Sequence, residues 1–319
     1  VMPDRRTRPD EAVVDLSLTI QRGDRMRIGR IDITGNDPTF DKVVRREVQV
    51  DEGEIYRGSL INASRQRLMR LGFFEDVTIS TPRGEGDDVL DVNVQVSERP
   101  TGTFSFGMGY SNLEGLVVTF NVQKNNFLGL GYLMSAAVNW SKLRRQGQLS
   151  FFDPYFLDSR WTAAIDGFYL TQQFQVQNDE YRRGGSLSIG RYLDQRDDVQ
   201  LSLRYTLEDV GLQSVDAYRL RLFGGELYRN GLTSTLGAVL SVDKRNDRIF
   251  PTRGLLTNLS TSLSGGFRIG DEQVLSLLGG DFNQIESRFN FRLYQPLLPN
   301  NNDQVVFKMN VSLGDIRST

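Results

Sequence analysis

Residues 103–110 read Thr103-Phe104-Ser105-Phe106-Gly107-Met108-Gly109-Tyr110, so every second side chain is large and apolar. This two-residue period is typical of a β-strand with one apolar face and one small or polar face. The same period returns in ten further segments up to Leu313, and turn residues such as Gly, Asn, Asp and Pro separate them. The chain beyond residue 100 is therefore predicted to form one meander of eleven antiparallel strands.

Charged side chains indicate what the two faces of these strands contact. Six charged residues within the strands have the parity opposite to the apolar set of their strand: Asp166, Arg204, Glu286, Arg288, Arg292 and Lys308. A Lys or Arg that faces lipid at mid-membrane costs about 2–4 kcal/mol, so this segregation is typical of a transmembrane β-barrel. A soluble β-sandwich shows the same alternation. The number and length of the strands favour the barrel, as do aromatic residues near strand ends, namely Tyr110, Trp140, Tyr155 and Phe156.

The composition excludes several classes of function. The 319 residues include 38 Lys and Arg, 40 Asp and Glu, and neither Cys nor His. A net charge of −2 argues against a nucleic-acid partner. Without Cys and His, this chain cannot form disulfides, thiolate or imidazole metal sites, or a Ser-His or Cys-His catalytic pair. We therefore expect no enzyme activity, no metal and no cofactor.

Residues 25–99 have a different pattern, which predicts a soluble β-α-α-β-β module. The strands are expected at Arg25–Thr34, around Val77 and at Leu90–Val96, where apolar residues alternate. Helical spacing lies between them. In the first helix Thr39 is expected to be the N-cap, and the apolar residues are Phe40, Val43, Val44 and Val48. In the second helix Ser59 is expected to be the N-cap, and Gly72 is expected to end the helix.

A weak internal repeat suggests how the domains are arranged. Val14–Ile20 has the same alternation as Leu90–Val96, the last strand of the module. We interpret residues 1–24 as the tail of a preceding module of the same kind, 25–99 as the barrel-proximal module and 100–319 as the barrel part. Chance alternation is the alternative for residues 1–24. Because a closed antiparallel meander needs an even number of strands, eleven strands indicate a fragment that is cut at both ends.

Several motifs occur in an order that resembles the BamA-type outer-membrane assembly family, in which POTRA modules precede a 16-stranded barrel. The most specific is the run from Arg67 to Phe74, RLMRLGFF. Gly107–Tyr110 is similar to the family's first barrel strand, and Asn126–Gly131 is similar to its turn after strand two. The remaining matches are Gly35-Asn36, Val44-Arg45-Arg46-Glu47, a turn after strand four at Asp153-Pro154-Tyr155-Phe156, and a turn before strand nine marked by Asp243, Pro251 and Gly254.

The resemblance implies assembly and insertion of β-barrel proteins into the outer membrane of a Gram-negative bacterium, with the POTRA part in the periplasm. Client strands would add to POTRA edges by β-augmentation and to a lateral gate at Thr103–Tyr110. The implied partners are unfolded outer-membrane β-barrel clients, lipoprotein subunits of the assembly complex, periplasmic chaperones and outer-membrane lipid. Arg45, Arg46 and Glu47 are the candidate residues for binding the lipoproteins.

Other interpretations stay open from the sequence. The glycines of the gate strand could serve barrel curvature alone, and the Arg45–Glu47 segment could be a solvated helix face. The chain ends before the family's Arg-Gly-Phe motif and its last five strands, so activity of this length of chain is in doubt. The alternative functions are a two-partner secretion pore or a TamA-like factor of the same superfamily, and the number of POTRA modules would separate them.

Overall fold

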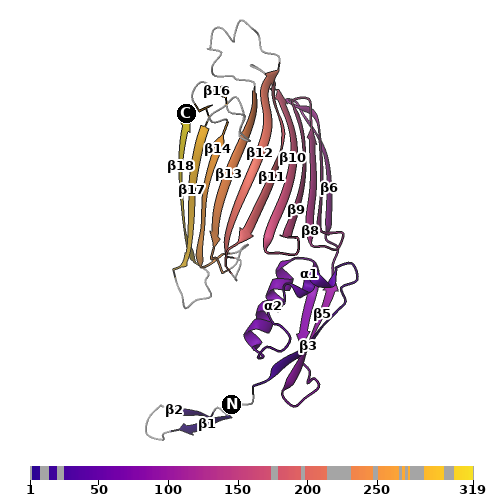
Figure 1. Ribbon diagram of the computed structural model, residues 1–319, viewed down its shortest axis with the longest axis vertical. Helices are drawn as coiled ribbons and strands as arrows, with labels where there is room; N and C mark the ends of the chain where they lie inside the picture. Colours follow the sequence, from indigo (N-terminus) through magenta and orange to yellow (C-terminus); the bar gives the residue numbers. More distant parts are fainter. Residues whose placement is uncertain are drawn as a thin grey trace. The chain divides into compact units, whose positions relative to one another are not determined.

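The computed structural model describes residues 2–7, 14–19, 25–173, 179–194, 198–213, 231–246, 251–265, 268–269, 272–273, 284–297 and 305–318. The chain forms two compact units, Val1–Pro100 and Thr101–Thr319. Figure 1 shows helices in the first unit and a curved sheet of long strands in the second. The predicted order, an α+β module followed by a large antiparallel sheet, is thus confirmed.

The first unit contains a three-stranded sheet with two helices. Its elements are β3 (Arg27–Thr34), α1 (Asp41–Arg45), α2 (Gly58–Arg70), β4 (Phe74–Ser80) and β5 (Val89–Glu98). β5 is the central strand, parallel to β3 and antiparallel to β4. Val77, Val92 and Val94 are fully buried, as the alternation predicts, and they pack with Val43, Val44 and Leu68 of the helices. β1 (Met2–Thr7) and β2 (Val14–Thr19) form a separate antiparallel pair.

Both helices begin at other residues than predicted. Thr39 is not the N-cap of α1, because Phe40 takes that position and no side chain caps the helix. The backbone N–H of the buried Thr39 donates to Glu98 Oε1 at 2.9 Å. Ser59 lies inside α2, whose first turn starts from the carbonyl of Arg57. α1 has five residues and ends before Val48. Gly72 does follow the end of α2, with a φ of +71° that L side chains rarely adopt.

The second unit is dominated by one antiparallel sheet of eleven strands, as predicted. Each strand pairs with its neighbours in the sheet, from the edge strand β6 to β18. The strands are β6 (Gly102–Ser111), β7 (Gly115–Phe127), β8 (Tyr132–Trp140), β9 (Arg144–Phe156), β10 (Trp161–Gln173), β11 (Asp179–Tyr192), β12 (Val199–Gln213), β13 (Gly231–Asp243), β14 (Gly254–Ser264), β17 (Gln284–Pro296) and β18 (Val306–Ser318). β15 (Arg268–Ile269) and β16 (Glu272–Gln273) form a short separate pair.

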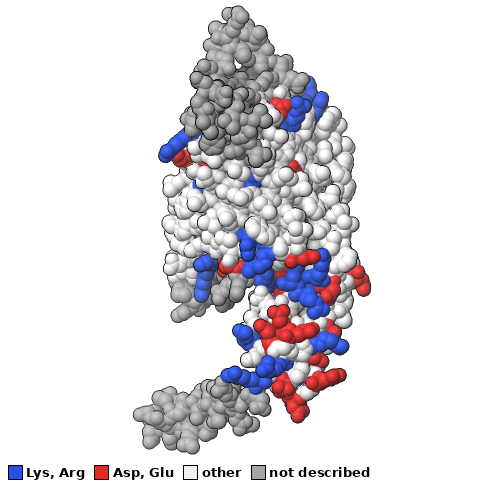
Figure 2. Space-filling model, in the orientation of Figure 1, with Lys and Arg blue, Asp and Glu red and all other residues white. Residues whose placement is uncertain are grey.

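The sheet has no apolar core among the described residues. The buried hydrophobic cluster lies entirely between residues 28 and 96, and the one buried hydrophobic residue described in the sheet is Tyr294. Large apolar side chains are instead exposed along the sheet, for example Ile165 at 56% and Leu187 at 57%. Figure 2 shows the face in view as a broad band with few charged side chains between its ends. A β-sandwich would bury these side chains between two sheets, so that alternative is wrong.

No helix in the described part of the chain is both long and apolar enough to cross a bilayer.

The motifs that resemble turns differ in where they lie: two fall between strands and one falls within a strand. Residues 128–131 form the turn after β7, and Gly131 N–H donates to the buried Asn126 Oδ1 at 2.8 Å. Asp243 ends β13 and Gly254 begins β14, with Pro251 in the connection. The Asp153-Pro154-Tyr155-Phe156 motif is not a turn: these residues are the end of β9, and the turn falls on residues 157–160, where Leu157 and Asp158 have positive φ.

Candidate functional site

The predicted gate strand, Thr103–Tyr110, lies within β6 at an edge of the sheet. β6 pairs with β7 from Gly102↔Lys124 to Ser111↔Gly115, and no described strand pairs with its other side. Its large apolar side chains are more exposed than those of β7, β8 and β9: Phe104 is 68% exposed, Phe106 61%, Met108 69% and Tyr110 79%. A strand in this position offers a row of backbone N–H and C=O groups to another strand.

The glycines of β6 are not equivalent. A Cβ on Gly107 would lie 2.6 Å from Thr119 Oγ1 on β7, so close approach requires glycine at that position. A Cβ on Gly109 would meet nothing within 4 Å. Sterics therefore explain Gly107 but not Gly109, whose effect is to remove a side chain and weaken the strand.

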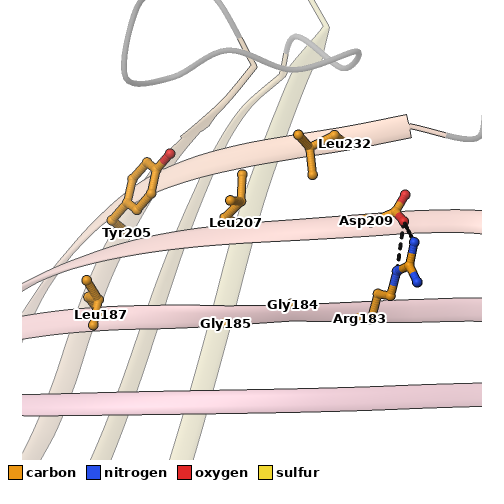
Figure 3. Close-up of a pocket in the computed structure, with 8 residues that line it drawn as sticks. All are labelled: Arg183, Gly184, Gly185, Leu187, Tyr205, Leu207, Asp209 and Leu232. Atoms are coloured by element: carbon orange, nitrogen blue, oxygen red, sulfur yellow. Dashed lines mark hydrogen bonds and ion pairs between the residues drawn. The ribbon is translucent and has the colours of Figure 1, made fainter.

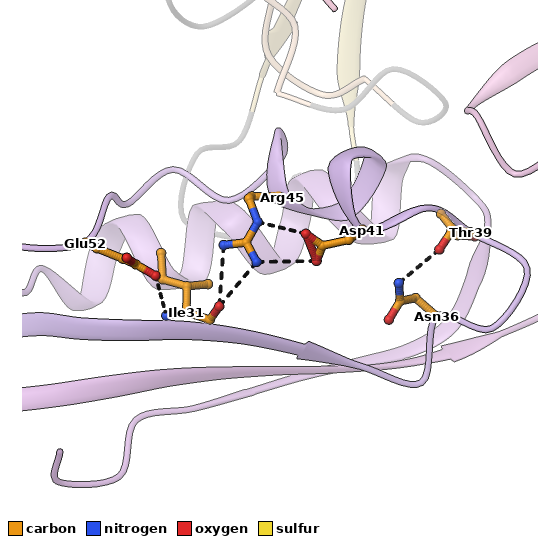
Figure 4. A network of polar contacts seen from close by, with 6 residues as sticks. All are labelled: Ile31, Asn36, Thr39, Asp41, Arg45 and Glu52. Carbon is orange, nitrogen blue, oxygen red and sulfur yellow. Dashed lines mark hydrogen bonds and ion pairs between the residues drawn. The ribbon is translucent and has the colours of Figure 1, made fainter.

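In the first unit, the β3 edge is already occupied by side chains and loop backbone. Ile28 N–H donates to Glu54 O at 2.8 Å, and Gly53 N–H donates to Ile28 O at 2.8 Å. Glu52 Oε1 accepts from Ile31 N–H at 3.1 Å. The Arg45 guanidinium donates to Ile31 O at 3.4 Å and binds Asp41 (Figure 4). An incoming strand would have to displace all of these contacts.

The β4 edge is more open. Among the described residues β4 pairs with β5 alone, and Val77 O accepts a hydrogen bond of 2.8 Å from Arg65 Nε of α2. The Arg65 side chain is 57% exposed, and its Nη2 lies 3.9 Å from Asp76 Oδ1. A single exposed side chain thus covers one carbonyl of this edge, and moving it costs little because exposed ion pairs are weak.

The predicted partner-binding residues have different environments. Arg45 is exposed, and its hydrogen bond to Asp41 raises the pKa of the guanidinium above its ordinary value. Arg46 is half-buried. Glu47 is buried and its Oε2 lies 3.0 Å from Arg67 Nε of α2, with side-chain exposures of 6% and 13%. Glu47 therefore belongs to the interior of the module, and of the three residues Arg45 presents the largest exposed surface.

The polar face of the sheet carries ion pairs. Asp166 Oδ2 accepts from Ser186 Oγ at 3.0 Å and lies 3.9 Å from Arg204 Nη1. Arg182 pairs with Glu208 at 2.6 Å, one strand further on. Within the described ranges no group of Asp or Glu side chains could hold a metal ion. These pairs keep charge on the face opposite to the apolar residues.

Sequence reasoning missed the residues that protect the module's edges. Arg65 contacts Val77 twelve residues away, and Glu52 contacts Ile31 twenty-one residues away. Both sit in segments whose apolar spacing is unremarkable, so their partners follow only from the tertiary arrangement.

These features define the class: a membrane-spanning antiparallel sheet that follows a small α+β module. Residues 126–318 match the Omp85 superfamily domain, and residues 26–99 match the POTRA family, described as a surface antigen variable number repeat. The chain belongs to the Omp85 superfamily.

The similar proteins include outer membrane protein assembly factors BamA. That of Neorickettsia risticii is 32% identical over 61% of this chain, and that of Nitratidesulfovibrio vulgaris is 25% identical over 91%. The chain spans 26% and 35% of their lengths. The crystal structure of Haemophilus ducreyi BamA lacking POTRA domains 1–3 matches all of this chain and 60% of its own, with a TM-score of 0.68 at 23% identity. These similarities identify an outer-membrane protein of BamA type whose POTRA module is periplasmic.

Proposed function

We propose that the protein containing this chain assembles β-barrel proteins and inserts them into the outer membrane. The observation that carries this proposal is β6, an exposed strand that pairs with β7 on one side, lies at the edge of the described sheet and carries Gly109, a glycine that no steric contact requires. A client strand would hydrogen-bond to this edge, extend the sheet and later leave into lipid. Backbone pairing suits this task because it demands no particular client sequence.

The POTRA module would receive the client at β4. The β3 edge is occupied from Ile28 to Ile31, whereas Arg65 alone is bonded to a β4 edge carbonyl among the described contacts. Periplasmic chaperones would deliver the unfolded client. We also propose that residues 1–24 are the tail of a preceding POTRA module, since β1 and β2 pair antiparallel as β4 and β5 do.

The lateral gate can be tested by locking it. These 319 residues have no Cys, so no thiol of their own competes with an engineered disulfide between a cysteine at Ser105 and one on the closing strand of the full-length protein. We expect the oxidised protein to lose client insertion and to regain it on reduction. A cysteine at Asn121 of β7, which pairs with Ser105, is the matched control, because a Ser105–Asn121 disulfide leaves the gate free. Full activity in the locked protein would contradict the gate.

Lipoprotein subunits of the assembly complex are proposed to bind at Arg45. The test is Arg45→Glu, with Arg30→Glu as a control because Arg30 is exposed in the same module and pairs with Asp32 on β3. Loss of lipoprotein co-purification with the first variant alone would support the site. Undiminished co-purification with both would rule it out.

A polypeptide secretion pore is the second candidate. CdiB from Escherichia coli and from Acinetobacter baumannii share the fold, with TM-scores of 0.55 and 0.51 at 13% and 12% identity. Depletion of the full-length protein separates the two functions. Loss of many outer-membrane barrels would support assembly, whereas loss of one secreted polypeptide with normal barrels would support secretion.

A further inference from the structure

The apolar face of the sheet carries a depression on β11 and β12. It has a volume of about 670 Å³, within the range of about 300–1,000 Å³ of ligand pockets. Its floor is the backbone of Gly184–Gly185, and Leu187, Tyr205, Leu207 and Leu232 stand around it (Figure 3). Because the face around it is apolar and exposed, the depression opens towards the bilayer.

A cation lies at one end of this depression. Arg183 Nε and Nη2 both bind Asp209 Oδ2, at 3.0 and 2.8 Å, while the Arg183 side chain stays 64% exposed. No contact to Arg183 Nη1 is found among the described residues of the sheet. The guanidinium is thus held in one place by Asp209 and still offers donors outward, which suits an anionic oxygen.

The position of Arg183 along β11 places it at a membrane surface. Arg191 is on the same face eight residues later and lies over the Trp161 ring at 5.3 Å. Eight residues span about 27 Å along the strand. At a tilt of about 40° they cross about 21 Å of the membrane, close to the height of the apolar band of such sheets. The two arginines therefore bracket the hydrocarbon layer.

The chain direction identifies the leaflet. β6 starts directly after the periplasmic module, and strands alternate in direction, so the Asp179 end of β11 is at the extracellular surface. Arg183 and the depression consequently face the outer leaflet.

We infer that this depression binds one acylated, phosphate-bearing lipid of the outer leaflet. The acyl chain lies over Gly184–Gly185 between Leu187 and Leu207, and the phosphate accepts hydrogen bonds from Arg183. The inference depends on the apolar face and not on the assembly function.

The test is native mass spectrometry of the full-length protein titrated with two lipids of identical chains. Dimyristoyl phosphatidic acid carries the phosphate, and dimyristoylglycerol lacks it. We expect one tightly bound phosphatidic acid and at least about tenfold weaker dimyristoylglycerol, the scale of one charge-assisted hydrogen bond. Equal binding of the two lipids would overturn the inference.

Two pairs of variants localise the site. Arg183→Gln should weaken phosphatidic acid binding about tenfold, and Arg191→Gln on the same strand and face should not. Leu207→Trp fills the depression and should abolish the tight site. Leu201→Trp is its control, since Leu201 is on the same face of β12 and equally exposed, 41% against 42%.

A fifth variant distinguishes a binding role of Arg183 from a structural one. Asp209→Asn keeps an amide oxygen that can still accept from Arg183 and removes the competing negative charge, so phosphatidic acid binding should hold or strengthen. If Arg183→Gln and Asp209→Asn weaken binding alike, the pair supports only the sheet. If Arg183→Gln and Arg191→Gln change phosphatidic acid binding equally, the lipid binds nonspecifically. Each of these two results would refute the site.

Discussion

Ile165→Arg tests whether the apolar face contacts lipid. Ile165 is 56% exposed and pairs with Phe151 on β9 and Leu187 on β11, so the new guanidinium would have apolar neighbours on both strands. The two nearest charge layers on this face are at Arg183, which pairs with Tyr169, and at Arg191, which pairs with Trp161, and both are four residues from Ile165 along β10. Tyr169 is four residues from Ile165, about 14 Å along the strand, so the charge stays deep in the apolar band.

The expected destabilisation is about 2–4 kcal/mol, the cost of Arg at the midplane of a transmembrane sheet. Since each 1.4 kcal/mol is a factor of ten, the folded fraction relative to the unfolded falls about 30-fold to 700-fold. The control is Ser150→Arg. Ser150 is on the polar face, paired with Asp166, so its guanidinium gains a carboxylate neighbour and the stability should change by less than about 1 kcal/mol.

The assay is urea unfolding of the full-length protein and both variants in phosphatidylcholine vesicles, followed by tryptophan fluorescence. The free energies of unfolding are compared at a common slope with denaturant. Equal destabilisation by Ile165→Arg and Ser150→Arg would refute the assignment of the two faces, because both sides of the sheet would then be wet or both would be in lipid.

Three further changes probe single contacts. Glu47→Ala should destabilise the module by about 3–5 kcal/mol, because Arg67, whose side chain is only 13% exposed, loses the carboxylate of the buried Glu47. Urea unfolding of residues 25–100, which contain their own core, measures this. In the same assay Gly72→Ala should cost about 1–2 kcal/mol, since its φ of +71° disfavours a Cβ. Gly109→Val should slow hydrogen exchange of the β6 amides, because the added side chain meets nothing and valine favours a strand. Gly107→Val should accelerate this exchange, because the added side chain collides with Thr119 Oγ1. Faster exchange in Gly109→Val and slower exchange in Gly107→Val would contradict the contacts of these glycines.

Most of the architecture follows from local pattern. Alternation locates all eleven strands of the large sheet, because a two-residue period needs no knowledge of distant partners. Gly72 is also predictable, since a positive φ after a helix favours glycine. The faces follow from charge parity, which sets Asp166 and Arg204 opposite to Ile165 and Leu203.

Tertiary contacts explain the parts that local pattern predicts wrongly. Thr39 has the chemistry of an N-cap, yet the helix starts one residue later, after Phe40, and the backbone N–H of Thr39 is held by Glu98, fifty-nine residues away. Glu47 has the sequence context of a solvated helix, yet it pairs with Arg67 in the interior. Asp153 belongs to a motif with a turn-forming proline, yet β9 continues through it with a register shift against β10 at Trp161 and Ala163. In each case a long-range partner decides the outcome.

The two units bury apolar surface in opposite ways, and this difference supplies a direction for the proposed transfer of a client. At β4 a client strand would form backbone hydrogen bonds in water, where each contributes about 0.5–1.5 kcal/mol net because water competes. At β6 the same bonds form beside hydrocarbon, where an unpaired backbone group costs several kcal/mol. The client also moves its apolar residues from water to lipid, at about 25 cal/mol per Å². Under the proposed function, the free energy of the client would therefore fall from the β4 edge to the β6 edge, and the transfer would need no ATP.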